Sequence, residues 1–351
     1  MKPSFRLPFG SVASSAVQST HLLVWVAAVL LFTVSPLLAP GSVSGTALRG
    51  MLPFAAILAI ASVGQLLVIQ QGGFDLSVPG AISLAVVIVT SYAGGHDHRL
   101  LAAIAIALAV VAGAGLLSGA MIAFFGVPPF VATLGVNALL LGGVLRISHG
   151  RSSQDVPPAL LRFSSASTAG MPNTVLCAIG LIAAVAFVQQ KTSLGRRFVS
   201  VGANAAAARA AGIRVQTYRL GTYVVASGLY VAAGILLAGF LGVVSLFPGD
   251  DYLLPTIAAV VLSGTSLRGG RGSAVAVAVG ALFLIQLQQV VLGLGAPHAV
   301  QLIVQGSIIA LAMAIRAAPR GRWRKAGIAP RAEPRPSTMN ASPQAPLHEK
   351  G

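Results

Sequence analysis

Long apolar runs, separated by short polar or basic connections, follow one another from Leu22 to Ile315 and constrain this chain more than any other feature. A helix needs about 20 apolar residues to cross the hydrocarbon core of a bilayer, and within one segment it satisfies every backbone polar group. The runs predict an all-α, polytopic membrane protein with about ten transmembrane helices. They lie at residues 22–38, 51–69, 78–92, 100–124, 129–147, 173–188, 218–240, 254–262, 273–292 and 298–315.

Several of these runs are too short to cross a bilayer in a straight line, notably 254–262. Backbone that leaves a helix at membrane depth is tolerated only where it is buried in protein or lines an aqueous cavity. We therefore expect some helices to be broken or re-entrant around an interior.

Composition favours a membrane protein over a soluble one. Hydrophobic residues make up 56% of the chain and charged residues 9%, whereas a soluble domain carries about 25% charged residues. The net charge of +16 is consistent with nucleic-acid binding in principle. However, the bases are concentrated in one loop and in the C-terminal tail, which is the pattern of cytoplasmic segments. We therefore expect membrane lipid, and no nucleic acid, among the partners.

Basic residues also predict the orientation, because cytoplasmic loops are enriched in Lys and Arg. Bases occur near the N-terminus, in 190–218, in 264–272 and in the C-terminal tail, so both termini are predicted to be cytoplasmic. The segments 148–172 and 241–252 are then external. They carry the acids Asp155, Asp250 and Asp251. Three arginines run against the assignment, namely Arg151 and Arg162 in the first segment and Arg146 just before it.

The same reading divides the chain into three parts. Residues 1–20 are predicted to be a cytoplasmic N-terminal segment, and residues 21–316 a transmembrane domain with a cytoplasmic loop at 190–218. Residues 317–351 are a basic tail rich in Pro, Ala, Arg and Ser, a composition that predicts disorder.

The loop 190–218 contains a basic island without acids, from Lys191 to Arg214. Its centre, 203–211, is rich in alanine and therefore predicts a short helix. Gly212 is a plausible stop for that helix. From composition alone, a docking helix and a plain positively charged loop remain equally open.

Gly72 and Gly73 interrupt two apolar runs and are followed by Asp75 and Ser77. The glycines break the helix, and the two polar side chains suit the start of a new helix near Val78. An ionisable residue at membrane depth is also a functional candidate. Asp75 is therefore either a helix cap or a functional group.

Neutral amides within the predicted helices mark a candidate translocation path. Gln286 and Gln289 are three residues apart and share one helix face, as do Gln301 and Gln305 four residues apart. Amides donate and accept hydrogen bonds without a fixed charge, which suits a neutral polyol. The alternative is hydrogen bonding between helices. The path residues predicted from the sequence are Gln65, Asp75, Asn137, Gln286 and Gln289.

No residue pattern typical of an enzyme or a metal site is present. Cys177 lies in an apolar run, and the histidines are dispersed without metal-ligand spacing. No Gly-x-x-x-x-Gly-Lys-Ser/Thr phosphate-binding loop occurs. We therefore expect no catalytic, metal-binding or cofactor-binding residues in this chain, and an energy source outside it.

Four stretches in order resemble the permease subunits of bacterial ATP-binding-cassette importers for monosaccharides, the ribose/xylose/arabinose family. The first is Gly72-Gly-Phe-Asp-Leu-Ser-Val78, similar to the family's Gly-Gly-Ile-Asp-Leu-Ser-Val. The others are 127–135 (Val-Pro-Pro-Phe-Val-Ala-Thr-Leu-Gly), 194–214 (Leu-Gly-Arg through Ala-Ala-Gly-Ile-Arg) and 257–272 (Ile-Ala-Ala-Val-Val-Leu-Ser-Gly-Thr-Ser-Leu-Arg-Gly-Gly-Arg-Gly). The resemblance covers about residues 50–316.

The resemblance implies a pair of permeases (two copies, or one copy with a paralogue), cytoplasmic ATPase subunits that bind the ATP, and a periplasmic sugar-binding protein. It places the family's coupling helix on Gly202–Gly212 within the loop 190–218. Departures at Pro79, Ser263 and 245–251 leave the particular sugar open. The predicted ATPase-coupling residues are Gly195, Arg196, Arg197, Gly202, Asn204, Ala207, Arg209 and Gly212.

The predicted function is therefore that of a multi-pass permease in a bacterial inner membrane. It would translocate a ribose-like pentose or a hexose by alternating access, driven by partner ATPases. An ion-coupled secondary transporter of a small polar solute is the alternative, although Asp75 is the one carboxylate suited to coupling. A membrane-embedded enzyme is disfavoured because no catalytic cluster is present.

Overall fold

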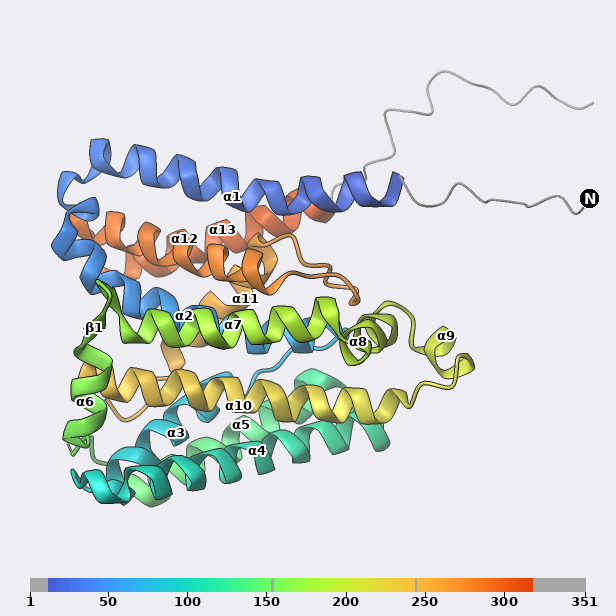
Figure 1. Ribbon diagram of the computed structural model, residues 1–351, viewed down its shortest axis with the longest axis horizontal. Helices are drawn as coiled ribbons and strands as arrows, with labels where there is room; N and C mark the ends of the chain where they lie inside the picture. Colours follow the sequence, from blue (N-terminus) through green and yellow to red (C-terminus); the bar gives the residue numbers. More distant parts are fainter. Residues whose placement is uncertain (1–11, 153–154, 244, 318–351) are drawn as a thin grey trace, which may run out of the picture. The chain divides into compact units, whose positions relative to one another are not determined.

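The computed structural model describes residues 12–152, 155–243 and 245–317, and these residues form a helical bundle (Figure 1). One pair of two-residue strands, β1 and β2, pairs antiparallel within them. In chain order the elements are α1 (Val12–Leu38), η1 (Pro40–Val43), α2 (Gly45–Gln70), α3 (Val78–Ala93), η2 (Asp97–Arg99), α4 (Leu100–Phe124), α5 (Pro129–Ser148), α6 (Pro158–Ser165), β1 (Ser167–Thr168), β2 (Met171–Pro172), α7 (Asn173–Lys191), α8 (Ser193–Ala203), α9 (Ala205–Ala210), α10 (Val215–Leu241), η3 (Asp250–Tyr252), α11 (Leu253–Leu262), α12 (Ala274–Gly293) and α13 (His298–Ala317).

The helices occupy the predicted apolar runs, and α4 has the predicted bounds. Among the described residues, six helices are long and apolar enough to cross a membrane, namely α2, α4 with η2, α5, α7, α10 and α12. The apolar part of α1 and all of α3 are shorter. The chain is therefore a polytopic, all-α membrane protein, while the count of about ten spans and the cytoplasmic termini stay predictions.

The chain divides into two units, residues 1–313 and residues 314–351, and the helical bundle belongs to the first. The predicted N-terminal segment 1–20 is helical from Val12, where α1 begins. The predicted tail 317–351 lies, except for Ala317, outside the described residues.

Helix α2 lies at the centre of the bundle, in contact with α7, α10, α11 and α12. Of its most apolar 18-residue window 89% is buried, against 17% for α7 and 22% for α4. The outer helices instead expose large apolar side chains such as Leu101, Leu139 and Phe187. Exposed leucine and phenylalanine are compatible with lipid as the surrounding solvent. Helices α2 and α3 are therefore internal, since most of their residues are buried, whereas α4, α5 and α7 have faces suited to the membrane.

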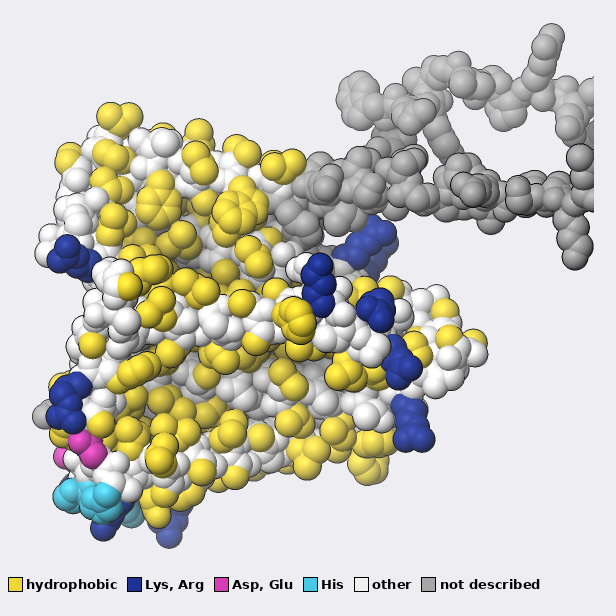
Figure 2. Space-filling model, in the orientation of Figure 1, with side chains coloured by type: hydrophobic (Ala, Val, Ile, Leu, Met, Phe, Trp, Pro, Cys, Tyr) yellow, Lys and Arg dark blue, Asp and Glu magenta, His cyan; other side chains and the backbone are white. Residues whose placement is uncertain are grey.

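Charge is distributed unevenly between the two ends of the bundle (Figure 2). Lys and Arg side chains gather at the end that carries α8 and α9, where Figure 2 shows no Asp or Glu. The opposite end carries acids and bases together, and there Arg162 forms an ion pair with Asp97 at 3.2 Å. This pair accounts for one of the three arginines that opposed the predicted orientation.

Candidate translocation and coupling sites

The chain breaks between α2 and α3 at the residues that the sequence indicates. Gly72 has a φ of +80°, and α3 begins after Ser77. The Asp75 side chain is 1% exposed. Its Oδ1 accepts hydrogen bonds from the Ser77 N–H (2.9 Å) and from the Ser77 hydroxyl. Asp75 thus organises the turn that starts α3, whereas the Ser77 side chain, which was also expected to cap the helix, makes no cap hydrogen bond.

Helix α5 holds the same turn from the other side. Thr133 Oγ1 accepts the Leu76 N–H at 3.0 Å, and Asn137 Oδ1 accepts the Gly80 N–H at 2.8 Å. The hydroxyl of Tyr230 on α10 donates to Gln65 Oε1 on α2 at 3.3 Å. The first turn of α3 is therefore fixed inside the bundle by polar groups of its neighbours, because an N–H at this depth has no water to bind.

A second break separates α10 from α11. After α10 ends at Leu241, the chain returns into the bundle, where Gly249 is buried and its N–H donates to Ser83 Oγ on α3 at 3.0 Å. Helix α11 has 10 residues, which corresponds to about 15 Å or half of a hydrocarbon core. It ends at the loop 263–272, in which the Gly270 N–H donates to the carbonyl oxygen of Gln70.

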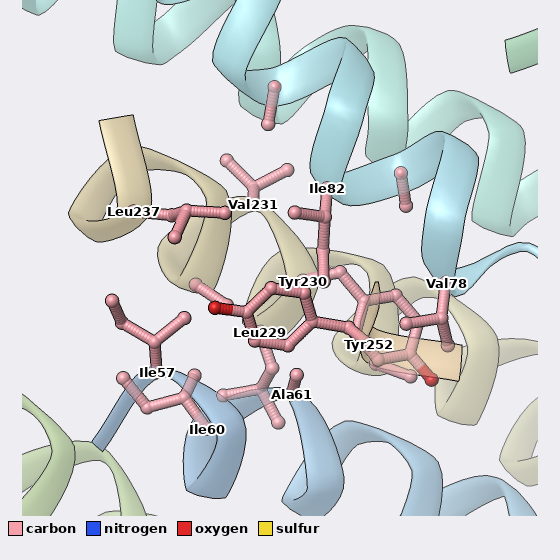
Figure 3. Close-up of a cluster of buried hydrophobic side chains, with 14 of the residues drawn as sticks. Ile57, Ile60, Ala61, Val78, Ile82, Leu229, Tyr230, Val231, Leu237 and Tyr252 are labelled. Carbon is pink, nitrogen blue, oxygen red and sulfur yellow. The ribbon is translucent and has the colours of Figure 1, made fainter. Parts of the chain in front are cut away.

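The starts of α3 and α11 therefore lie close together inside the bundle, and the two helices run to opposite ends. Figure 3 shows Val78 and Ile82 of α3 near Tyr252, which directly precedes α11, together with Tyr230 of α10. All four side chains are buried. This is a broken-helix arrangement of the kind that the short run 254–262 predicts.

A cavity of about 660 Å³ opens beside the start of α11. Its wall is built by α2, the end of α10, the connection to α11, and α12 and α13, with Phe54 and Tyr252 among its apolar residues. Partial burial and the neighbouring charge of Asp251 raise the pKa of the Asp250 carboxyl. No lysine or arginine is among the described residues that line the cavity. The polar lining residues are Ser245, Asp250, Asp251, Gln288, Gln289, Gln301 and Gln305.

The structure separates the predicted path residues into three places. Gln289 lines the cavity. Gln286, on the same helix, is fully buried, and its Nε2 donates to Ser35 Oγ on α1 at 3.0 Å, which is the interhelical bond that the alternative reading expected. Asp75 and Asn137 make hydrogen bonds at the start of α3, and Gln65 of α2 accepts the hydroxyl of Tyr230 on α10. Their roles in transport stay predictions.

The path predicted from the sequence omits several polar residues of the cavity, among them Gln288, Asp250 and Asp251. Gln288 directly precedes Gln289, and the two acids were assigned to an external turn. The pairing of adjacent glutamines was a usable signal for Gln288. Nothing in the sequence indicated that the acidic turn folds back against α3, because that contact depends on the break after α10.

Helices α8 and α9 form the basic end of the bundle. Asn204 separates them, and its Oδ1 accepts the N–H groups of Ala206 and Ala207, both at 3.0 Å. The helix predicted at 203–211 is therefore shorter than expected, and Gly202 belongs to α8 rather than to one coupling helix with Gly212. The physical reason is that an asparagine side chain binds the free N–H groups of a helix start and so ends the preceding helix.

Helix α9 packs against α8 and α10 through one buried residue. Ala208 is buried against Val201 and Val215, and the φ of Gly212 is +78° where the chain leaves the helix, as the predicted stop requires. Six of the eight predicted coupling residues are exposed at this end, namely Arg196, Arg197, Asn204, Ala207, Arg209 and Gly212. Gly195 and Gly202 instead lie against neighbouring backbone: a Cβ at Gly195 would collide with the carbonyl oxygen of Val188.

Several known proteins are similar to this chain over most of its length. A family model described as "Branched-chain amino acid transport system / permease component" matches residues 47–313. The probable ABC transporter permease protein y4mJ of Sinorhizobium fredii is 34% identical over 84% of this chain and 87% of its own length. The ribose import permease protein RbsC of Escherichia coli is 32% identical over 83% and 91%, respectively. The autoinducer 2 import system permease protein LsrC of an Enterobacter species is 30% identical over 78% and 80%. No solved structure matches the chain.

Proposed function

This chain belongs to the family of branched-chain amino acid transport system permease components and is a permease of the ATP-binding-cassette type; from this premise we propose that it carries a monosaccharide, a ribose-like pentose or a hexose. An external binding protein delivers the sugar, and partner ATPase subunits supply the energy. The permease works beside a second copy or a paralogue in a bacterial inner membrane.

The lining of the cavity supports a sugar over an amino acid. The carboxylate of an amino acid needs a cationic partner when it leaves water, and the described lining residues include no lysine or arginine. Sugar hydroxyl groups donate to carboxylates such as Asp250 and Asp251, and they both donate to and accept from glutamine amides. The rings of Phe54 and Tyr252 offer apolar surface to the C–H groups of a sugar. A ribose permease among the relatives agrees with this substrate class.

The mechanism follows from the two sites. The basic end with α8 and α9 faces the cytoplasm, because cytoplasmic loops are rich in Lys and Arg. ATP binding closes the ATPase dimer, and the motion enters the permease through α9. The cavity then changes from outward to inward access. The exposed arginines Arg196, Arg197 and Arg209 aid the docking of an acidic ATPase surface, mainly by orientation and encounter rate.

The energy source can be tested in cells that lack ATP. We expect uptake of radiolabelled D-ribose to stop when cells are depleted of ATP while a proton gradient is maintained, because the coupling energy comes from the ATPase. Cells that retain ATP but have lost the gradient should keep the uptake. Ribose uptake that persists without ATP would mean that an ion gradient drives this protein.

The substrate class can be tested at the two cavity carboxylates. The double variant Asp250→Asn/Asp251→Asn should lower the rate of ATP-driven D-ribose uptake by about tenfold, because hydrogen bonds to charged acceptors are roughly twice as strong as neutral ones. Asp97→Asn is the matched control, since it removes an acid at the same end, outside the residues that line the cavity. Faster uptake of labelled leucine by the double variant, with unchanged ribose uptake, would instead favour an amino acid.

A further inference from the structure

Gln70, the last residue of α2, makes three hydrogen bonds to two separate parts of the chain at the basic end. Its carbonyl oxygen accepts the Gly270 N–H at 2.8 Å, and its Nε2 donates to the carbonyl oxygen of Gly272 at 3.3 Å. Its Oε1 accepts a hydrogen bond from Gln189 Nε2, at the end of α7, at 2.8 Å. The side chain is 1% exposed. These bonds join the central helix to α7 and to the loop between α11 and α12.

Helix α8 contacts the backbone of Gln70 directly at Gly202. A Cβ at Gly202 would collide with the carbonyl oxygen of Gln70, so only glycine permits the observed approach. A Cβ at Gly270 would lie 2.9 Å from the Cα of Ala203, which directly follows Gly202. The neighbouring Gln71 donates through Nε2 to the carbonyl oxygen of Phe198 at 3.0 Å. The end of α8, next to α9, is thus held against the end of α2 without intervening side chains.

Both elements that meet α8 at Gln70 extend to the cavity. Helix α2 contributes Met51, Phe54 and Leu58 to the cavity wall, and α11 contributes Leu254 and Pro255 from its first turn. The loop that follows α11 is the one bound by Gln70. Figure 1 shows this loop between α11 and α12 reaching the end of the bundle beside α8. A displacement of α8 therefore acts on two walls of the cavity through a single buried side chain and its backbone.

We propose that Gln70 is the positioning residue that transmits motion of α8 and α9 to the cavity, by holding the end of α2 and the loop after α11 against Gly202. This inference rests on the proposed function, because it assumes that an ATPase moves α9. It adds a specific contact, that of Gln70 with α7, α8 and the loop after α11. If this contact is weakened, the ATPase still binds and hydrolyses ATP, but the cavity no longer changes its access when the ATPase moves.

The test uses the complete importer, with its ATPase and binding protein, reconstituted in proteoliposomes with D-ribose as the probe. Gln70→Met keeps the side-chain volume and removes the hydrogen bonds to Gly272 and Gln189. We expect the number of ribose molecules imported per ATP hydrolysed to fall about tenfold, while ATPase co-purification and basal hydrolysis stay at the wild-type level. Gln190→Leu is the matched control, because Gln190 is exposed and lies next to Gln189 at the end of α7. It should leave the ratio unchanged.

A second readout follows the cavity itself. In a Cys177→Ser background, spin labels at the exposed positions Thr46 and Val243 report the distance across the outer end of the bundle. Trapping with ATP and vanadate should shift this distance in the wild type and not in Gln70→Met. If Gln70→Met fails to assemble, Gln189→Met provides a second test, because it removes the hydrogen bond to Gln70 Oε1 and leaves Gln70 itself intact.

The possible outcomes distinguish failure of the Gln70 proposal from failure of the proposed function. Wild-type protein that neither imports ribose nor changes its distance with nucleotide would contradict the proposed function. Suppose instead that the wild type imports ribose and changes its distance. If the variants then show the same import ratio and the same distance change, the proposed role of Gln70 is wrong. A lower melting temperature with an unchanged ratio would likewise overturn it, since it would reveal a purely structural residue.

Discussion

Replacing Gly212 with tryptophan should abolish ATP-driven ribose uptake while the permease remains folded in the membrane. The φ of Gly212 is +78°, a region that costs other residues about 1–2 kcal/mol. No atom lies within 4 Å of the position that its Cβ would take, so the bundle itself tolerates a larger residue. The indole would instead occupy the exposed face of α9, where the proposed ATPase contact forms. Strain and bulk would therefore both act on the coupling segment alone.

Uptake in vesicles and co-purification of the ATPase measure this result together. Gly212→Asn is the matched control, because asparagine tolerates a positive φ and adds little bulk, and it should retain most of the uptake. Arg209→Glu should uncouple in the same way by reversing an exposed charge on α9. Normal uptake and normal co-purification in both Gly212→Trp and Arg209→Glu would exclude α9 as the docking segment.

Replacing Gly249 with valine should also eliminate uptake, but by disrupting the cavity rather than the coupling segment. A Cβ at Gly249 would collide with the carbonyl oxygen of Pro79, and its second-nearest atom, at 2.9 Å, is the carbonyl carbon of the same residue. Both neighbours are backbone at the start of α3, so no rotamer change relieves the overlap. The connection to α11 must then leave its site, which breaks the hydrogen bond from Gly249 to Ser83 and removes Asp250 from the cavity. Overpacking of this kind costs about 1–3 kcal/mol or more.

The expected signature differs from that of Gly212→Trp. The ATPase should still co-purify with Gly249→Val, because α8 and α9 lie at the other end of the bundle, and ATP hydrolysis should continue without import. Gly113→Val on α4 is the control, since no atom lies within 4 Å of the point where a Cβ at Gly113 would sit. Ribose import by Gly249→Val at the wild-type rate would show that the connection need not pack on α3.

The positions of the helices along the chain could be predicted closely from the sequence. Each predicted run contains a helix, and the glycine pair at Gly72 and Gly73 marks the break before α3. The reason is local: in lipid, a segment that cannot bond to water must satisfy its backbone within itself, so apolar length alone predicts a helix. The division at Asn204 was within reach of the same reasoning, because asparagine favours helix starts over helix interiors.

The grouping of polar side chains could not be predicted in this way. Gln286 and Gln289 share a helix face in the sequence pattern, yet Gln286 binds Ser35 of α1 and Gln289 lines the cavity. The rotation of α12 about its axis, and the helix or cavity that lies opposite each glutamine, decide between these roles. Helical periodicity states which residues share a face but not which face meets another helix and which meets a cavity.

The sequence by itself determined that this protein spans a membrane, that the chain breaks before α3, which loop is basic and which permease motifs it contains. Each of these depends on contiguous residues, whose apolar length, charge and backbone preferences act locally. Only the tertiary structure decided that Gln70 meets Gln189 and Gly272, and that Gly249 packs on α3. Those contacts join residues more than a hundred positions apart, and they form because buried polar groups must find partners wherever helix packing brings them.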